Sequence, residues 1–314
     1  MADKPLISVI TINYNQVQVT CELLNSLRKV TWPNLEIIVV DNGSHEPADQ
    51  ISKDYPEVNL IRSDQNLGFA GGNNLGIMHA RGEFMLFINN DTEVEPGFLE
   101  PMVNLFENND KIGMVSPKIK FYYHPDTIQY AGFSKINIFT LRMNGIGYRE
   151  KDDGKYDQVT ETNFAHGCAM MVPHRVIREA GMMPEDYFLY YEEHDWSMRI
   201  KNRGYRIFYQ PASVVMHKES ISTGKASTLK TYYFTRNRIL FARRNITGIA
   251  ARLSCIYMVT VAIPKSLTLY VLKFQFNHFK AYIRAVMWHV KTLNKRFRIN
   301  EKSKIHQLHP LHPG

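Results

Sequence analysis

Two groups of acidic residues occur at positions where a carboxylate could bind a metal ion or act as a general base. Asp91 closes the stretch "LFINND", in which an apolar run ends abruptly in two amides and an acid, and three further acids occur close together in "YEEHDWS". A carboxylate that follows a buried strand can hold a hard divalent cation such as Mg²⁺ or Mn²⁺. A carboxylate in the first turn of a helix can act as a general base. The second group also has a simpler explanation, because the macrodipole favours acids at any helix N-terminus.

Alternating strands and helices would position these acids. Strands are predicted at residues 6–13, 35–42, 58–64 and 82–89, and helices at about 17–30, 47–54 and 72–80. This alternation predicts a mostly parallel sheet covered on both faces, whose ligands collect at the carboxyl ends of the strands. Polar clusters at Asn13, Asp41 and Asp91 follow three of these strands. Each cluster alone could be an ordinary turn, because Asn, Asp and Gly are common turn residues. Three such clusters at one edge of the sheet favour a binding site.

The glycines argue against two common nucleotide sites. A dinucleotide fingerprint would place G-x-G-x-x-G directly after the first strand, where "NYNQVQ" stands. The segment "GFAGGNNLG" at residues 68–76 follows the third strand and lacks the lysine of a P-loop. We expect it to form a loop whose backbone can approach a ligand, followed by a helix N-terminus near Gly72.

The charge of the chain is unevenly distributed. From Lys225 onward, 17 Lys and Arg residues face a single acid, Glu301, while the preceding part is net acidic. Such a basic segment favours a polyanionic partner, either nucleic acid or anionic lipid. Within this segment, the apolar residues 253–263 are expected to be too short to span a bilayer, and residues 266–290 have the pattern of basic amphipathic helices.

The cysteines and the N-terminus indicate a compartment. The three cysteines are widely spaced and odd in number, which argues against a disulfide framework or a cysteine-rich zinc site and fits a reducing environment. The first residues lead straight into a predicted strand without a signal-peptide pattern, so we do not expect secretion.

Five ordered segments carry a family resemblance: "SVITINYN", "IIVVDNGS", "NLGFAGGNNLG", "FINNDTEV" and "YFLYYEEHDWSMRIKNRGY". Over residues 6–244 the chain resembles family 2 of the inverting glycosyltransferases, especially its bacterial rhamnosyltransferase-like branch. The resemblance implies the GT-A nucleotide-diphosphosugar transferase fold, an α/β fold with a mostly parallel central sheet and helices on both faces. It also suggests three parts, namely a GT-A domain at 1–245, a basic amphipathic helical region at 246–300 that associates with membranes, and a flexible tail at 301–314.

The resemblance assigns the donor and metal sites. The residues expected to bind the donor are Asn13, Asp41, Asn66, Gly68, Asn73, Asn90 and Arg236. Asp41 would contact the nucleobase or ribose. The later arginines, Arg236, Arg238, Arg243 and Arg244, would lie near the donor diphosphate or a lipid-diphosphate acceptor. Arg236 is the favoured phosphate ligand among them, with the alternative that Arg238 and Arg243 simply face water. The family's Asp-x-Asp metal motif keeps only its last acid here, Asp91. His217 resembles a histidine that completes the metal shell in some relatives, with a strand-capping histidine as the alternative.

The resemblance also implies an activity. Glu193 falls at the base position, with Asp195 or Glu192 as alternatives. The reaction would move a single sugar, for example rhamnose from a deoxythymidine diphosphate (dTDP) donor, to a saccharide or lipid-linked acceptor with inversion, in cell-surface polysaccharide synthesis. We expect a divalent cation, Mg²⁺ or Mn²⁺, as cofactor.

The expected partners are the nucleotide sugar, the acceptor and an anionic membrane, without nucleic acid, and the expected location is the cytoplasmic, inner face of the cell membrane. Other function classes fit less well. A nucleic-acid-binding protein using the basic segment would leave Asp41, Asp91 and Glu193 without a task. A sugar nucleotidylyltransferase would need a glycine-rich basic loop after the first strand, and a pseudoenzyme would not need an acid at every expected position.

Overall fold

The N-terminal half of the sheet is parallel, as its apolar runs predict. The computed structural model describes residues 4–219 and 227–295, so the expected tail at 301–314 lies outside the described residues. The first four strands are β1 (Ile7–Asn13), β2 (Leu35–Asn42), β3 (Val58–Ser63) and β4 (Phe84–Ile88), connected by helices α1 (Val17–Leu27), α2 (Asp49–Asp54) and α3 (Gly68–Ile77). Parallel pairing in the register Asn13↔Asp41 brings two predicted site residues together at the carboxyl edge.

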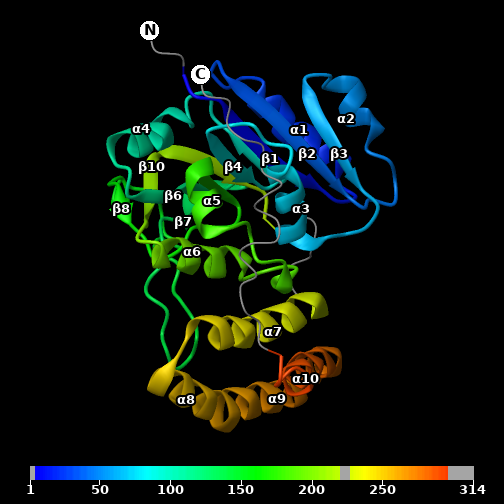
Figure 1. Cartoon of the computed structure of the whole chain (residues 1–314). Coiled ribbons are helices and arrows are strands. Elements are labelled where there is room, and N and C mark those ends of the chain that lie inside the picture. The colour runs from blue at the N-terminus through cyan, green and yellow to red at the C-terminus, as the bar shows by residue number, and fades with distance from the viewer. Residues whose placement is uncertain (1–3, 220–226, 296–314) are drawn as a thin grey trace.

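Alternation of side chains along the strands buries both faces of the sheet. Ile7 and Val9 pack with α1, α2 and α4 (Glu100–Asn108) on one face, whereas Ile10 packs with α3, α5 (His174–Ala180) and α6 (Glu192–Asn202) on the other. The period of two along a strand makes this division. The α/β fold with helices on both faces is confirmed (Figure 1).

The second half of the sheet is mixed. Its strands are β5 (Thr92–Val94), β6 (Ile112–Phe121), β7 (His124–Tyr130), β8 (Thr160–Glu161), β9 (Ala169–Pro173) and β10 (Arg206–His217). The sheet order is β3-β2-β1-β4-β9-β6-β10-β5, and β9 pairs antiparallel with both β4 and β6. Uninterrupted parallel pairing is therefore confined to the half formed by β1 to β4. It ends at β9, because this strand returns from the excursion at residues 131–168 in the opposite direction.

The glycine-rich segment forms helix rather than the predicted loop. α3 begins at Gly68, four residues before the expected start, and two of its glycines, Gly72 and Gly76, face β1. A Cβ on Gly72 would lie 2.8 Å from Ile12 Cδ1, and one on Gly76 would collide with Ile10 Cγ2. The glycines therefore let the helix approach the sheet closely, which brings the N-terminus of α3 to the carboxyl edge.

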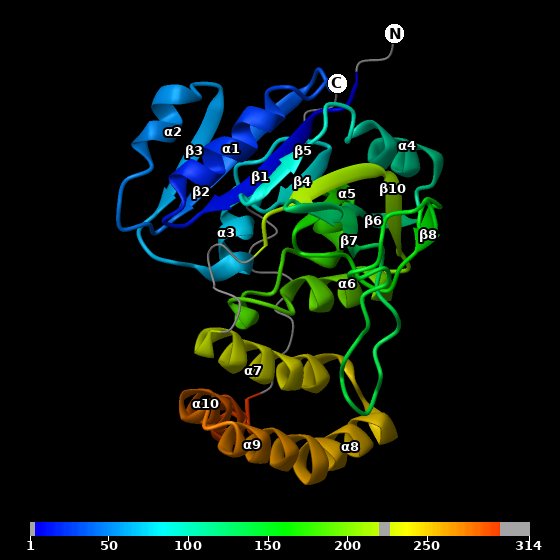
Figure 2. The same ribbon diagram turned by 180° about the vertical axis from the view of Figure 1, so that it is seen from behind.

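Four further helices form the C-terminal region. They are α7 (Thr228–Asn245), α8 (Gly248–Tyr257), α9 (Ile263–Leu272) and α10 (Phe276–Lys291), with a π-helical segment, Met258–Ala262, between α8 and α9. α7 and α10 pack together, and α8 and α9 form the edge of the molecule farthest from the sheet (Figures 1 and 2). The region is helical, as expected.

The expectation that the apolar residues 253–263 are too short to span a bilayer is wrong, because the apolar helix that contains them continues beyond Pro264. Gly248–Leu272 forms a continuous 25-residue helix of mean hydropathy 1.6 in its most apolar window, and among the described residues it alone is long and apolar enough to cross a membrane. Proline lacks an N–H and normally disrupts a helix interior. Here the preceding π-helical segment displaces the local hydrogen bonds, and the helix continues through Pro264.

His289 links α10 to α7 in its neutral form. Nε2 donates to the Arg236 carbonyl at 2.7 Å, and Nδ1 lies 3.1 Å from Arg243 Nη1, which can only donate. Burial, together with the nearby Arg243 and Arg236 charges, lowers the pKa of His289 to about 4, although the bond to the Arg236 carbonyl acts in the opposite direction. Protonation of His289 would therefore be unfavourable, because it would place a positive charge in a buried position next to another cation.

We expect this histidine to make the protein acid-labile. An unfolded histidine titrates near pH 6.5, so the unfolded state binds the proton first and stability falls as pH decreases from about 6.5 to 4. The loss attributable to His289 is on the order of 3 kcal/mol. Thermal unfolding of wild type and His289→Gln between pH 7.5 and 4.5 measures it, and the variant should decline less steeply. Parallel pH curves for the two proteins would contradict the assignment.

Candidate functional site

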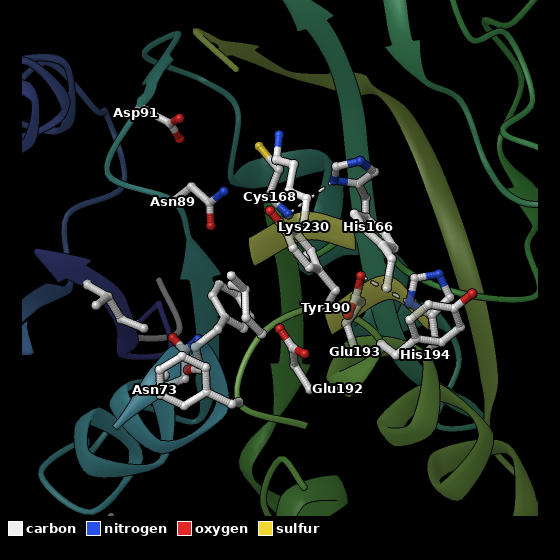
Figure 3. A pocket seen from close by; sticks show the side chains of 18 of the residues that line it. Asn73, Asn89, Asp91, His166, Cys168, Tyr190, Glu192, Glu193, His194 and Lys230 are labelled. Atoms are coloured by element: carbon white, nitrogen blue, oxygen red, sulfur yellow. Dashed lines mark hydrogen bonds and ion pairs between the residues drawn. The ribbon is translucent and has the colours of Figure 1, made fainter. Parts of the chain in front are cut away.

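A cavity of about 640 Å³ opens at the carboxyl edge of the parallel strands. The predicted site residues in its wall are Asn66, Gly68, Asn73, Asn90, Asp91, Glu192, Glu193 and His217. Figure 3 shows Asp91 and Glu193 on different walls of this one cavity, although 102 positions separate them in the chain. The fold therefore brings both groups of acids singled out in the sequence to a common space.

Asp91 and His217 form a buried pair at one end of the cavity. Antiparallel pairing of β10 with β5 sets His217 opposite Thr92, and its Nε2 lies 3.1 Å from Asp91 Oδ1. Nδ1 contacts Gln129 Oε1 at 2.7 Å, and because an amide oxygen only accepts, Nδ1 must donate. Burial by itself would lower the pKa of His217, but the Cys168 sulfur and the Asp91 carboxylate raise it well above its usual value. In the protein without metal the two side chains form an ion pair.

The same pair suits a divalent cation. With Nδ1 protonated toward Gln129, loss of the Nε2 proton leaves a lone pair directed at the space beside Asp91. A carboxylate and an imidazole are both ligands of Mn²⁺, and Mg²⁺ needs few protein ligands because it keeps water and substrate phosphates. Within the described ranges, no group of three or more His, Cys, Asp or Glu side chains gathers for a metal. Any cation here would depend on the substrate for further ligands.

The side chain of Glu193 lines the cavity, and one of its carboxylate oxygens has no partner among the described residues. Its Oε1 lies 3.0 Å from His194 Nδ1, and the oxygen without a partner is the buried Oε2. Burial favours the neutral acid, but His194, through its charge and its hydrogen bond, outweighs it and holds the pKa of Glu193 below its usual value. Burial and the adjacent Glu193 charge raise the pKa of Glu192 far above its usual value. The pair therefore favours the ionised form at Glu193 and the neutral form at Glu192.

Asp195, an alternative candidate for the base, does not line the cavity. It is 0% exposed, and its Oδ2 accepts from Tyr187 Oη at 2.7 Å and from Arg244 Nε at 2.7 Å. Asn245 Nδ2 donates to the same oxygen at 3.1 Å. One oxygen of this carboxylate thus accepts from three donors, two of them on α7, while Oδ1 lies 3.8 Å from Arg199 Nη2 of α6, so its role is to tie α6 to α7. The expectation of Asp195 as base is corrected.

The donor-binding predictions divide into two sets. Asn66, Gly68, Asn73 and Asn90 line the cavity, and Asn66 Oδ1 accepts from the Gly68 N–H at 2.8 Å at the start of α3. Asn13 and Asp41 are buried beside the cavity rather than in its wall, joined by a 2.9 Å hydrogen bond. Their expected contact with a nucleobase or ribose stays a prediction.

Arg236 has a different task from the predicted one. Its Nη2 donates to the Asp186 carbonyl, and its guanidinium lies 4.6 Å from the Trp288 ring centroid. It is buried between the loop before α6 and helix α10 and does not line the cavity. The expectation that Arg236 binds the donor is corrected, because packing of α7 turns this side chain toward protein carbonyl and aromatic groups.

Asn237, which was not among the predicted site residues, shapes the loop before Glu193. Phe188, Tyr190 and Tyr191 have φ values of 64°, 69° and 78°, a region that is strained for aromatic residues. Asn237 Nδ2 contacts the carbonyls of Tyr187, Leu189 and Tyr190 at 3.0, 2.7 and 2.7 Å. This fully buried amide thereby stabilises the strained loop that presents the acids. The sequence signal that could have pointed to this role is an Asn in a helix otherwise rich in aromatic and basic residues.

Comparisons with known proteins agree with this architecture. Residues 8–179 match the family model described as glycosyl transferase family 2. The chain is 25% identical over 239 residues to a low-salt glycan biosynthesis hexosyltransferase of Haloferax volcanii, covering 74% of each chain. It is 24% identical over 230 residues to a dTDP-rhamnosyl transferase of Shigella flexneri, covering 68% of this chain and 72% of that one.

A solved structure shows the same fold. The mannosyltransferase PcManGT from Pyrobaculum calidifontis, solved with GDP-Man and Mn²⁺, superposes with a TM-score of 0.58 at 15% identity, covering 94% of this chain and 89% of that one. At this identity the likeness concerns the fold alone.

Proposed function

The chain belongs to glycosyl transferase family 2, and from this premise we propose that it transfers one sugar from a nucleotide-diphosphate donor to an acceptor hydroxyl with inversion at the anomeric carbon. The observation that carries the proposal is the shared cavity with Asp91 on one wall and Glu193 on another. A glycosyltransferase of this kind must favour departure of a diphosphate and accept a proton from the attacking alcohol. Asp91, through a bound cation, would assist departure of the diphosphate, and Glu193 would accept the proton.

Glu193 is proposed as the base. Its unpartnered Oε2 accepts the hydroxyl proton while the acceptor oxygen bonds to the anomeric carbon and the bond from that carbon to the diphosphate oxygen breaks. The electron pair of the broken bond leaves with the nucleoside diphosphate. A single displacement of this kind inverts the anomeric configuration, and the ionised state of Glu193 suits it to act at neutral pH.

Asp91 and His217 are proposed to hold Mg²⁺ or Mn²⁺ near the donor phosphates. The cation, when bound, would neutralise negative charge on the departing diphosphate. Support comes from the geometry of the pair and from the presence of Mn²⁺ in the superposed mannosyltransferase structure.

Rhamnose from a dTDP donor, used in cell-surface polysaccharide synthesis, is proposed as the substrate on the basis of the similarity to the Shigella dTDP-rhamnosyl transferase. The test is a panel of dTDP-, UDP- and GDP-sugars with purified protein and Mn²⁺, recording thermal shift and nucleoside diphosphate release. We expect both signals to be largest with dTDP-rhamnose. A larger response to another donor would reject this sugar, and no response to any nucleotide sugar would reject the proposed function.

We also propose that α8 and α9 attach the protein peripherally to the inner face of the cell membrane. This 25-residue helix is mostly apolar and only 6% of its most apolar window is buried in the protein, with Ile256 and Val259 58% and 59% exposed. Exposed apolar surface of this extent favours a partner. Its basic residues, Arg252 and Lys265 within the helix and Lys273 directly after it, match the anionic lipid of a cytoplasmic leaflet.

Replacing both Ile256 and Val259 with Asp should release the protein from membranes. Burial of one such side chain contributes about 1.5–3 kcal/mol, so loss of two lowers lipid partitioning on the order of 100-fold or more. Flotation with phosphatidylglycerol-containing vesicles measures it. Val159→Asp, also at an exposed apolar residue, is the matched control and should float like wild type.

Two results would contradict membrane attachment. The Ile256→Asp, Val259→Asp variant floating normally would exclude this face as the lipid contact. A wild-type dimer in lipid-free buffer that the double substitution dissociates, without any flotation of wild type, would assign the face to a second copy of the chain.

A further inference from the structure

Three consecutive residues before β9, His166, Gly167 and Cys168, line the cavity as a strip. At one end of this 166–168 strip, a Cβ built on Gly167 would lie 3.5 Å from Cδ of Glu193, so the Gly167 backbone adjoins the carboxylate. At the other end, the Cys168 thiol interacts with the imidazole of His217. The strip therefore reaches from the proposed base to the proposed metal site.

His166 is held firmly within this strip. Its backbone N–H donates to Ser116 Oγ of β6 at 3.1 Å. Its ring stacks on the Phe133 ring, with 5.9 Å between the ring centroids and an interplanar angle of 6°. Figure 3 shows the His166 ring on the side of the cavity that also bears Cys168 and Glu193. The imidazole thus has a fixed orientation before any ligand binds.

The hydrogen bond at Nδ1 fixes the tautomer of His166. The Cys168 backbone N–H donates to Nδ1 at 3.1 Å, so Nδ1 carries a lone pair and the proton of the neutral ring is on Nε2. Burial lowers the pKa of His166 to about 3; the charge of His217 acts in the same direction and that of Glu193 in the opposite one. The ring is therefore neutral near pH 7, with Nε2–H as its one side-chain donor.

The Nε2–H group of His166 is available to a ligand. Within residues 4–219 and 227–295, the side chain makes only the hydrogen bond at Nδ1, and Nε2 does not belong to the buried atoms without a partner. Nε2 is therefore accessible to solvent, and His166 lines the cavity. A few fixed polar groups among apolar neighbours give a ligand pocket its orientation and specificity.

The position and charge of this donor indicate which part of the substrate it meets. In a single displacement, the anomeric carbon lies between the acceptor oxygen, close to Glu193, and the diphosphate oxygen, close to Asp91. The 166–168 strip reaches between these two ends, so a sugar held there would lie against it. Phosphates bind charged donors most strongly, whereas a neutral N–H suits a neutral hydroxyl oxygen.

We propose that His166 donates from Nε2–H to a hydroxyl group of the transferred sugar and thereby contributes to the choice of sugar. The inference rests on the proposed function, because the position of the sugar follows from the proposed roles of Asp91 and Glu193. A sugar that lacks this hydroxyl, or that carries it in the opposite configuration, would leave the N–H without a partner and bind less tightly.

Two substitutions separate this donor from the local structure. In His166→Asn, the shorter amide can still accept from the Cys168 N–H but has no group at the position of Nε2. In His166→Gln, the longer amide can place an N–H near the position of Nε2 but loses the acceptor at Nδ1. A sugar-binding role predicts that the Asn variant is impaired and the Gln variant partly rescued, whereas a purely structural role predicts the reverse.

Calorimetric titration of the full chain with Mn²⁺ measures the effect, using dTDP-rhamnose and dTDP, or the corresponding pair if another sugar gives the largest response in the donor panel. We expect His166→Asn to bind the nucleotide sugar about two- to tenfold more weakly than wild type. Its affinity for the nucleoside diphosphate, which lacks the transferred sugar, should be unchanged, and His166→Gln should recover part of the loss. His124→Asn, the same substitution at an exposed histidine outside the cavity, is the control and should bind both ligands like wild type.

The possible outcomes separate this inference from the proposed function. Equal affinity of wild type and His166→Asn for the nucleotide sugar would overturn the inference and leave the proposed function intact. An equal loss of affinity for the nucleotide sugar and the nucleoside diphosphate would also overturn it, since the substitution would then have disturbed the whole cavity. If wild type bound no nucleotide sugar, the proposed function would be rejected and the inference with it.

Discussion

Glu193→Gln is expected to lower sugar transfer by about 10²–10⁴-fold while donor binding is retained. The substitution keeps the size of the side chain and removes the oxygen that takes the proton. It leaves Asp91 and the α3 wall of the cavity unchanged, so the nucleotide sugar should still shift the melting temperature. Steady-state transfer rates and donor thermal shift, measured on the same preparation, check the two parts of this prediction.

Glu192→Gln is the matched control for this experiment. Glu192 is buried beside Glu193 and its raised pKa favours the neutral form, so a neutral amide of the same size should change transfer only slightly. A different outcome would reassign the chemistry. If Glu193→Gln retained near-normal transfer and Glu192→Gln lost it, the base would be Glu192.

Asp91→Asn is expected to abolish Mn²⁺ binding and to lower transfer by about two orders of magnitude or more, because the charge that attracts the cation is lost. Electron paramagnetic resonance of Mn²⁺ titrated into the protein measures binding without reference to activity. The fold should be preserved, since Asn can keep the contact with His217 at the strand end. Wild-type Mn²⁺ affinity in this variant would reject the metal role of Asp91.

His217→Gln distinguishes the two expectations for the histidine. If His217 is a metal ligand, this variant should bind Mn²⁺ more weakly than wild type but more tightly than Asp91→Asn. If it only caps the strand end, Mn²⁺ affinity should stay at the wild-type value and the melting temperature should fall.

The parallel half of the fold was predictable because its signals are local. Apolar runs of strand length alternate with segments of helical periodicity, and this alternation sets the order and direction of β1 to β4. The polar residue after each apolar run marks the carboxyl edge of the sheet. The convergence of Asp91 with Glu193 was expected from the family resemblance. In the structure it depends on β9 and β10 returning to the sheet beside β4 and β6, which no local pattern specifies.

Errors in the sequence analysis arose where distant packing decides the outcome. Asp195 resembles a catalytic acid in sequence, but Arg244, 49 residues later, neutralises it. Arg236 and Arg238 leave α7 on different sides because they are two residues apart on a helix, and the sequence does not show that one side faces Trp288 of α10 and the other a cavity. Pro264 looked like a helix end because composition does not reveal a π-helical turn before it.

The most direct test of the account is a crystal structure of the full chain with Mn²⁺ and a nucleoside diphosphate, chosen from the donor panel. The account predicts an anomalous Mn²⁺ peak bonded to Asp91, with the diphosphate beside it and the terminal phosphate facing the space in front of Glu193. A nucleotide and Mn²⁺ bound away from Asp91, or a diphosphate with no open path to Glu193, would contradict the claim that these two carboxylates serve one reaction.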